Sequence, residues 1–422
     1  MKRRLLFGER MLLGDGTEPF NTVIPFRLKG TFVLKGIQHA LNQLQVKHPW
    51  LKAVIKHDEK NIPWFEVSEK VKIPIRILAK KEENDWLQES KNEWYKMFNY
   101  KEQPLIRFVW IKGEEISDMM FVFHHCLCDG GSAMALLYEF LKLLDNPSAE
   151  IGVENPILGI QDVVPFEILN SLGQKIKAKV IGRLAATAIK CIPVNKKPTD
   201  RQNDYLIHWK FDKETSKALI SYCKSQEVTV NTFLSASLLQ AFKKVKGEKA
   251  FNKVSCPVDI RRFANQIKDD HIFAFGLMIV VSLNKKLGFE ENLKLMQETV
   301  DKKTAKLNPY ITMMVMESAH DALKNFTKLL KNSKSSNDCM FSNLGRIQIP
   351  HEYREFTLEG IFSPSVIGPL GNTTTMVTST FRGEMDFSFM GSEGYLPYIE
   401  ALAIRSEMIR TIKQQLKSSA VS

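Results

Sequence analysis

The stretch Phe121-Val122-Phe123-His124-His125-Cys126-Leu127-Cys128-Asp129-Gly130-Gly131 decides how the rest of this chain is interpreted. An apolar strand delivers two histidines, a short turn delivers an aspartate and two glycines, and a helix is expected over Ser132–Leu144. Imidazole has an unperturbed pKa near neutrality. A histidine held at a strand end can therefore take a proton from a hydroxyl or amine as that group attacks a carbonyl. The pattern makes His125 a candidate general base.

Three other interpretations of this stretch stay open. A pair of histidines at a strand end can be purely structural. His124, His125, Cys126, Cys128 and Asp129 can all bind metals, but a structural zinc site takes four ligands spread over two loops. The chain has no matching Cys-x-x-Cys or His-x-x-His pair, so we expect no metal site. A Cys–His nucleophile pair is also disfavoured, because neighbouring side chains on one turn rarely point at each other.

Length and composition indicate a large globular protein without disulfides. The chain has 422 residues, of which 44% are hydrophobic and 25% charged, so we expect two domains or one two-part unit. Its six cysteines are scattered, which favours a reducing, cytoplasmic setting. Glu9, Arg10 and Asp15 interrupt the apolar residues near the N-terminus, so no signal peptide is expected. The chain contains no apolar run long enough for a transmembrane helix.

The formal net charge of +12 serves solubility or points to an anionic partner. The anionic candidates are the phosphates of coenzyme A, an acidic carrier protein or a membrane surface. We expect no nucleic-acid partner, because the chain has no basic run interleaved with aromatic residues. Residues 168–189 combine basic and apolar side chains. This segment is either a peripheral membrane contact, a shield over a substrate channel or a solvated crossover helix.

The chain divides into two halves of similar style. Strand-like and helix-like segments alternate in both, which predicts an α/β (α+β) fold with mixed sheets. Five prolines between Asn146 and Asp204 indicate a connection there. We expect an N-terminal half over residues 1–165, a linker with a basic helix over 166–204 and a C-terminal half over 205–422.

Several motifs besides His-His-x-x-x-Asp-Gly resemble one family. The chain is similar to the chloramphenicol-acetyltransferase-like, CoA-dependent acyltransferase superfamily, which includes peptide-synthetase condensation domains, alcohol acetyltransferases and polyketide-associated acyltransferases. The supporting segments occur in the family's order and are Lys47-His48-Pro49-Trp50-Leu51-Lys52, Pro104-Leu105-Ile106-Arg107, Pro257-Val258-Asp259-Ile260-Arg261-Arg262-Phe263 and Phe341-Ser342-Asn343-Leu344-Gly345-Arg346.

The resemblance implies two chloramphenicol-acetyltransferase-like halves in a V with a central channel. His125 matches the family's catalytic histidine and His124 the packed one, while Gly130 completes the motif. Asp129 matches an aspartate that forms a salt bridge with an arginine in the family. Lys52 stands at the position of that arginine, but a lysine cannot form a bidentate pair. Arg107 is the alternative partner.

The resemblance also places an oxyanion donor in the glycine region or in the second half. Thr378 and Thr380 are expected to share one face of a strand there, and Asn343 is either a turn residue or a channel contact. Threonine is also common in strands for packing reasons alone.

The function implied is acyl transfer from a thioester to a hydroxyl or amine acceptor, in lipid or secondary-metabolite synthesis. The donor would be acyl-CoA or the phosphopantetheinyl thioester of an acidic acyl-carrier protein, with no permanently bound cofactor. The alternative is a non-catalytic, condensation-like docking module that binds a carrier protein.

Overall fold

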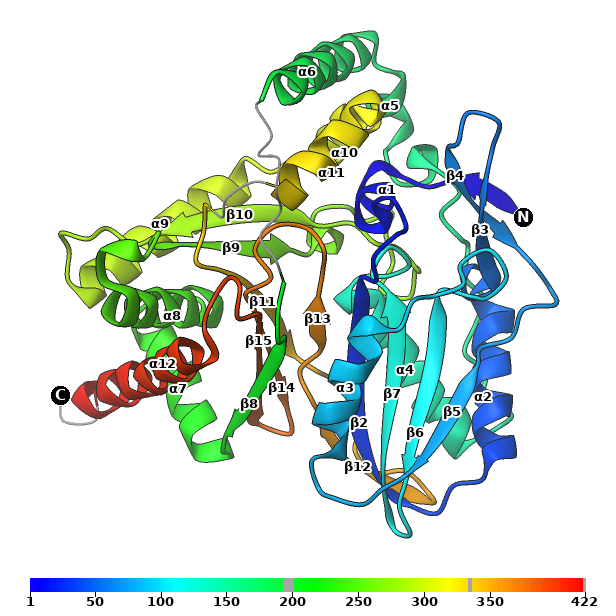
Figure 1. Ribbon diagram of the computed structural model, residues 1–422, viewed down its shortest axis with the longest axis horizontal. Helices are drawn as coiled ribbons and strands as arrows, with labels where there is room; N and C mark the ends of the chain where they lie inside the picture. Colours follow the sequence, from blue (N-terminus) through cyan, green and yellow to red (C-terminus); the bar gives the residue numbers. More distant parts are fainter. Residues whose placement is uncertain (193–200, 333–335, 420–422) are drawn as a thin grey trace.

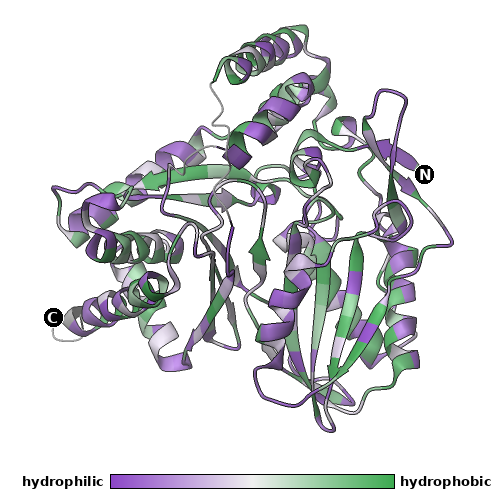
Figure 2. Cartoon of the chain, in the orientation of Figure 1, coloured by the Kyte–Doolittle hydropathy of each residue, from purple (hydrophilic) through white to green (hydrophobic). Residues whose placement is uncertain are grey.

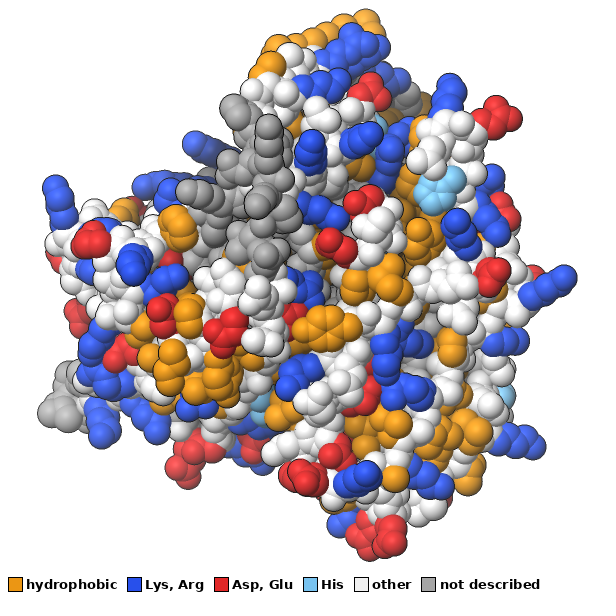
Figure 3. Space-filling view, viewed as in Figure 1, with side chains coloured by type: hydrophobic (Ala, Val, Ile, Leu, Met, Phe, Trp, Pro, Cys, Tyr) orange, Lys and Arg blue, Asp and Glu red, His pale blue; other side chains and the backbone are white. Residues whose placement is uncertain are grey.

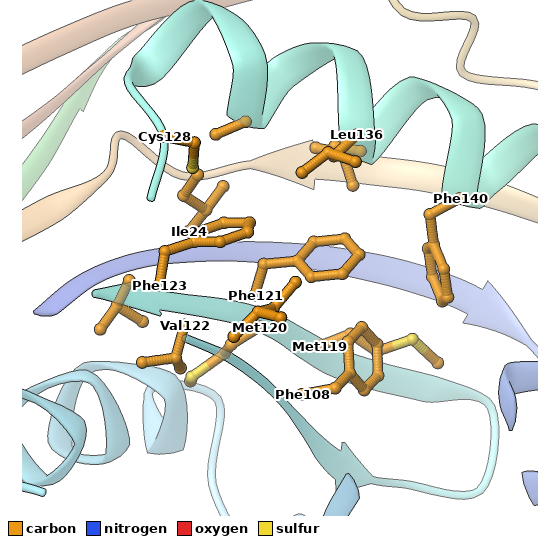
Figure 4. Close-up of a cluster of buried hydrophobic side chains, with 14 of the residues drawn as sticks. Ile24, Phe108, Met119, Met120, Phe121, Val122, Phe123, Cys128, Leu136 and Phe140 are labelled. Carbon is orange, nitrogen blue, oxygen red and sulfur yellow. The ribbon is translucent and has the colours of Figure 1, made fainter. Parts of the chain in front are cut away.

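The middle of strand β7 (Ile116–His124) lies inside the N-terminal half because Met119–Phe123 are apolar on both faces of the strand. In the computed structural model, which describes residues 1–192, 201–332 and 336–419, β7 pairs antiparallel with β2 (Asn21–Gly30) and β6 (Ile106–Lys112). Phe121 and Phe123 point toward helix α4 (Gly130–Asp145), while Met120 and Val122 point to the opposite face (Figure 4). A strand covered on both faces reads as a continuous apolar run, as this one does.

The N-terminal half contains one large and one small sheet. The large sheet has the order β12-β2-β7-β6-β5, and β13 (Ser365–Ile367) pairs with β2 on the same edge as β12 (Phe356–Ile361). The small sheet has the order β1-β4-β3. The elements of this half not yet bounded are β1 (Lys2–Arg4), α1 (Phe7–Leu13), α2 (Leu34–Lys47), β3 (Ala53–His57), β4 (Pro63–Val67), β5 (Ile75–Ala79) and α3 (Asp85–Tyr95).

The C-terminal half is a second mixed sheet of six strands in the order β10-β9-β11-β14-β15-β8. Helices α7, α8, α9 and α12 lie around it, and the two halves stand side by side (Figure 1). Its bounds are β8 (Tyr205–Phe211), α7 (Lys213–Ser225), α8 (Val230–Lys246), β9 (Lys253–Val258), β10 (Leu277–Ser282), α9 (Phe289–Ala305), α10 (Pro309–Glu317), α11 (Leu323–Asn332), β11 (Cys339–Arg346), β14 (Thr375–Phe381), β15 (Glu384–Gly391) and α12 (Tyr398–Ser419).

A segment of the C-terminal half completes the N-terminal sheet. Strands β12 (Phe356–Ile361) and β13 (Ser365–Ile367) both pair antiparallel with β2. Between them, Phe362 donates its backbone N–H to the carbonyl oxygen of Pro25. The missing N–H of Pro25 therefore faces the gap between β12 and β13, where no ladder partner needs it. Residues 356–367 thus tie the two halves together.

The expected fold class of two mixed α/β halves is confirmed. The predicted boundaries at 165 and 204 stay a prediction, and part of the predicted linker, residues 193–200, lies outside the described residues. Within the rest of that linker are two helices, α5 (Phe166–Asn170) and α6 (Leu172–Cys191). The hydrophobic residues concentrate in the sheets and on the inward helix faces (Figure 2).

The aromatic cluster between β7 and α4 carries much of the N-terminal core. Phe121 contacts Phe108 at 5.1 Å and Phe140 at 5.3 Å between ring centroids, and all three rings are fully buried. Aromatic pairs at these spacings stabilise a core beyond the area that they bury. The cluster fixes the strand end that carries the two histidines.

We expect Phe121→Ala to lower the free energy of unfolding by about 3–5 kcal/mol, because the surrounding rings cannot fill the cavity. Urea denaturation monitored by tryptophan fluorescence measures this change. Val46→Ala, at an exposed site on α2, is the control and should change the free energy by less than about 0.5 kcal/mol. Equal effects of the two substitutions would contradict the assignment of Phe121 to the core.

Candidate active site

His125 lies directly beyond the end of β7. Its backbone N–H donates to the carbonyl oxygen of Phe20 at 2.7 Å, and the ring of Phe20 stands edge-on to the imidazole at 5.0 Å. Nδ1 lies 3.4 Å from the carbonyl oxygen of Cys128. A carbonyl oxygen only accepts, so this contact places the proton on Nδ1. Nε2 is then the nitrogen with a free lone pair, as a general base requires.

The surroundings of His125 favour its neutral form. Burial lowers the pKa of the imidazole, and the contact with the Cys128 carbonyl and the charge of Asp129 oppose this only in part. The side chain nevertheless keeps a partly exposed surface, whereas His124 beside it is 4% exposed. A deep but accessible neutral imidazole can accept a proton.

His124 has the opposite hydrogen-bonding pattern. Its Nδ1 accepts from the backbone N–H of Cys126 at 3.3 Å, so the proton of the neutral ring is on Nε2. Burial lowers the pKa of His124 to about 3, with contributions from His125 and Arg107. Phe98 packs on the ring. These contacts describe a packed, neutral histidine.

The two cysteines of the turn belong to the hydrophobic core. Cys126 and Cys128 are buried, and Cys128 points from the start of α4 toward the side-chain cluster (Figure 4). Burial raises the pKa of both thiols well above its usual range, so neither is a thiolate at neutral pH. Among the described residues, no group of three or more histidine, cysteine, aspartate and glutamate side chains is arranged to bind a metal.

Asp129 caps helix α4 and also contacts the C-terminal half. Its Oδ1 accepts from the backbone N–H of Ser132 at 2.9 Å, which satisfies a free donor of the first helical turn. Its Oδ2 accepts from Nη1 of Arg261 at 2.7 Å. The backbone N–H of Asp129 donates to the carbonyl oxygen of Phe273 at 3.0 Å. Asp129 therefore holds the turn and does not orient the His125 ring directly.

Arg261 is the arginine that pairs with Asp129, and the two partners expected from the sequence are wrong. Lys52 pairs instead with Glu69 at 2.6 Å, and Arg107 pairs with Glu93. Lys52 is the last residue of the short helical turn Pro49–Lys52 and Arg107 lies on β6, so each is already neutralised by a carboxylate of the N-terminal half. The Arg261 side chain is only 6% exposed.

The ion pair between Asp129 and Arg261 forms a clamp between the two halves, and the hydroxyl of Ser132 adds to it. It donates to the carbonyl oxygen of His271 at 2.7 Å and accepts from Nη2 of Arg261 at 2.8 Å. The guanidinium of Arg261 thus bridges the first turn of α4 and residues 271–273 of the other half. A planar guanidinium makes the two contacts with two different nitrogens, Nη1 and Nη2, whereas a lysine has a single nitrogen.

Gly130 lies where Leu344 of the second half approaches the histidine turn. A Cβ atom at this position would be 2.7 Å from Cδ2 of Leu344, so a larger residue would displace that side chain. Leu344 follows Asn343 on β11, whose Oδ1 accepts from the backbone N–H of Gly345 at 2.8 Å. Asn343 lies within strand β11, so the interpretation as a turn residue is wrong, and its role as a channel contact stays a prediction.

Two threonines of β14 differ in whether their hydroxyl groups are free to contact a substrate. Thr378 is buried, and its Oγ1 donates to the backbone carbonyl of Asp386 at 2.8 Å. Thr380 is two residues further on the same strand and is partly exposed. Asn343 is the register partner of Thr378 in β11. The Thr378 hydroxyl already donates to an acceptor. Among the three residues considered as oxyanion donors, Thr380 and Asn343 are therefore more free to donate.

A second buried network supports the same region. His48 contacts Glu139 at 2.6 Å through Nε2 and Glu154 at 2.7 Å through Nδ1. Although burial opposes the charge, the two carboxylates raise the pKa of His48. Lys47 pairs with Glu139 and with Asp270 of the other half. These contacts hold residues 270–273 beside α4.

Two cavities lie elsewhere in the described chain. One has a volume of about 550 Å³ between α6 and α10, and the other, of about 140 Å³, lies beside β15. His125 lines neither of them. The predicted channel through His125 therefore stays a prediction.

The comparisons with known proteins agree with the resemblance seen in the motifs. The model of the condensation-domain family matches residues 1–152, which include the His-His-x-x-x-Asp-Gly segment. No curated protein matches the chain significantly. This match supports the resemblance to condensation domains over residues 1–152, and the fold is shared over almost the whole chain.

Similar solved structures span almost the whole chain. Trichothecene 15-O-acetyltransferase from Fusarium sporotrichioides is 11% identical with a TM-score of 0.74, over 97% of this chain and 95% of that one. The first condensation domain of the calcium-dependent antibiotic synthetase is 12% identical with a TM-score of 0.72, over 99% and 96%. The epimerization domain of the third module of tyrocidine synthetase B is 14% identical with a TM-score of 0.65, over 100% and 98%. At these identities the likeness establishes the fold.

We expect Arg261→Gln to lower the free energy of unfolding by about 2–4 kcal/mol, because it leaves the Asp129 carboxylate without its buried partner. Chemical denaturation measures the loss. Arg262→Gln, at the exposed neighbouring position, is the matched control and should stay within about 0.5 kcal/mol of the parent. If Asp129→Asn and Arg261→Gln add independently in a double-mutant cycle, the clamp is not an interaction.

Proposed function

We propose that this protein transfers an acyl group from a thioester to a hydroxyl or amine acceptor, with His125 as general base. The observation that carries the proposal is the neutral, partly exposed His125 ring whose Nδ1 faces a backbone carbonyl. The family match and the shared fold support acyl transfer as the class of reaction.

The proposed reaction needs one proton transfer in each direction. His125 Nε2 removes the proton from the acceptor as its oxygen or nitrogen attacks the thioester carbonyl carbon. The resulting tetrahedral intermediate collapses by breaking the C–S bond. The leaving thiolate takes the proton from the imidazolium, so the ring returns to its neutral form. A low pKa suits this role, since the ring must be neutral before each turnover.

The developing oxyanion requires a hydrogen-bond donor. Asn343 is the donor that we favour, because its Oδ1 accepts from Gly345, which leaves the amide N–H groups to donate, and because its chain neighbour Leu344 approaches Gly130 of the histidine turn. Thr380 is the second choice. Thr378 is the weakest of the three, since its hydroxyl would have to leave the Asp386 carbonyl.

The donor is proposed to be acyl-CoA or an acyl-carrier thioester, used as a co-substrate with no bound cofactor. Condensation domains act on thioester-bound substrates, and one of them shares this fold. The net charge of +12 suits the phosphates of either donor. An epimerization domain also shares the fold, so the fold alone does not determine which reaction is catalysed.

We expect His125→Ala to lower kcat by roughly 10²–10⁴-fold, because removing a general base costs about this much. The assay follows thiol release from a panel of acyl-CoAs and acyl-carrier thioesters, with and without alcohols and amines. His351→Ala, at a partly exposed histidine in the connection between β11 and β12, is the control and should retain the parental rate. Full activity of His125→Ala contradicts the proposal. Tight carrier binding without turnover by the parental protein would favour the docking module.

The pH dependence tests the protonation state of the base. Because burial lowers the pKa of His125 below 6.5, the fraction of active, neutral base should fall only when the pH drops under that value. We therefore expect the acid limb of kcat/KM to have an apparent pKa below 6.5, since this parameter reports groups of the free enzyme. An acid limb with an apparent pKa above 7 would contradict the proposed environment of the ring.

A further inference from the structure

Helix α6 projects from the body of the protein and packs through one narrow side. Its buried residues are Ala178, Gly182 and Ala186. The helix packs on α10 (Figure 1). A Cβ atom on Gly182 would lie 2.7 Å from the carbonyl oxygen of Val315. The two helices therefore touch closely along small residues, and the rest of the α6 surface is left outside the core.

The outward side of α6 is apolar along its length. Leu172, Ile176, Val180 and Leu184 follow at intervals of four, so they share one face of the helix. They are 72%, 54%, 49% and 66% exposed. Phe166 of the preceding α5 is 75% exposed. Hydrophobic side chains are visible on the outer rim of this helix at the top of Figure 3. A continuous exposed apolar row of this kind marks an interaction surface.

Basic residues lie along one flank of this apolar row. Lys175, Lys179, Arg183 and Lys190 line the groove of about 550 Å³ between α6 and α10, in which Asp321 is the one acidic lining residue. Residues 166–192 as a whole carry five basic side chains and a single acidic one, Glu167. An apolar face bordered by lysine and arginine is typical of helices that lie in the plane of a membrane surface.

We propose that residues 166–192 bind the surface of an anionic phospholipid membrane. The apolar row would enter the boundary between headgroups and acyl chains, and the basic flank would contact the phosphates. The row runs along a helix of 20 residues, about 30 Å at 1.5 Å per residue, which suits an extended lipid surface better than a compact partner. Among the described residues no helix is long and apolar enough to cross a membrane, so the contact is peripheral.

This surface lies apart from His125 and is independent of the proposed acyl transfer. Its chemistry also fits an acidic protein, but an acidic carrier would use the basic flank and leave the apolar row uncovered. Lipid binding uses both features at once. Binding to a membrane therefore requires Ile176, Val180 and Leu184, whereas binding to an acidic carrier protein does not.

The test is co-sedimentation of the full chain with vesicles of phosphatidylcholine alone or mixed with phosphatidylserine. We expect binding to the anionic vesicles, weak binding to the neutral ones and a decrease at high salt. The triple variant Ile176→Gln, Val180→Gln and Leu184→Gln should lose about tenfold or more in partitioning. Lys175→Gln, Lys179→Gln and Arg183→Gln together should lose a similar factor, because each basic residue near the surface contributes.

The matched control is the triple variant Val46→Gln, Ile220→Gln and Ile399→Gln, which removes three exposed apolar side chains from other helices. It should sediment like the parental protein. Equal binding to neutral and anionic vesicles, an unaffected α6 variant or binding of an acidic carrier protein in place of vesicles would overturn the proposal. Thiol release measured in the absence of vesicles separates a failure here from a failure of the acyl-transfer proposal.

Discussion

The ion pair between Asp129 and Arg261 is the interaction on which the geometry of the histidine turn depends. Asp129 caps α4 with one carboxylate oxygen and binds the guanidinium with the other. The same guanidinium contacts the Ser132 hydroxyl, which holds the His271 carbonyl of the second half. Asp129 thus stabilises both the start of helix α4 and the contact between the two halves. The strand end that carries His125 is thereby fixed between them.

Features that depend on neighbouring residues could be predicted from the sequence, whereas features that depend on tertiary contacts could not. The apolar run of β7 and the helix after Asp129 follow from periodicity and capping, and the structure has both. The central strand β2 contains Pro25, a residue type that argues against a central strand when only the sequence is considered. Its missing N–H is harmless only where β12 and β13 leave a gap, and that gap is a property of the tertiary fold.

The partner of Asp129 could not be found from spacing alone. Arg261 is 132 residues away, and its two-arginine motif was noted without a role. Lys52 was expected from its position in the family pattern, but only the folded chain shows that its ammonium lies beside Glu69. Long-range pairing depends on how the halves meet. The signal that was available is the presence of Arg261 and Arg262 directly after a strand.

Two adjacent histidines acquire different properties from their immediate contacts. His124 accepts a backbone hydrogen bond, while Nδ1 of His125 faces a carbonyl oxygen. Long-range ¹H–¹⁵N NMR of the histidine rings across a pH titration, assigned with the single-histidine variants, distinguishes these states most directly. We predict that His125 is the neutral Nδ1–H tautomer at neutral pH, with a pKa below 6.5. An Nε2–H tautomer, or an imidazolium at neutral pH, would contradict it.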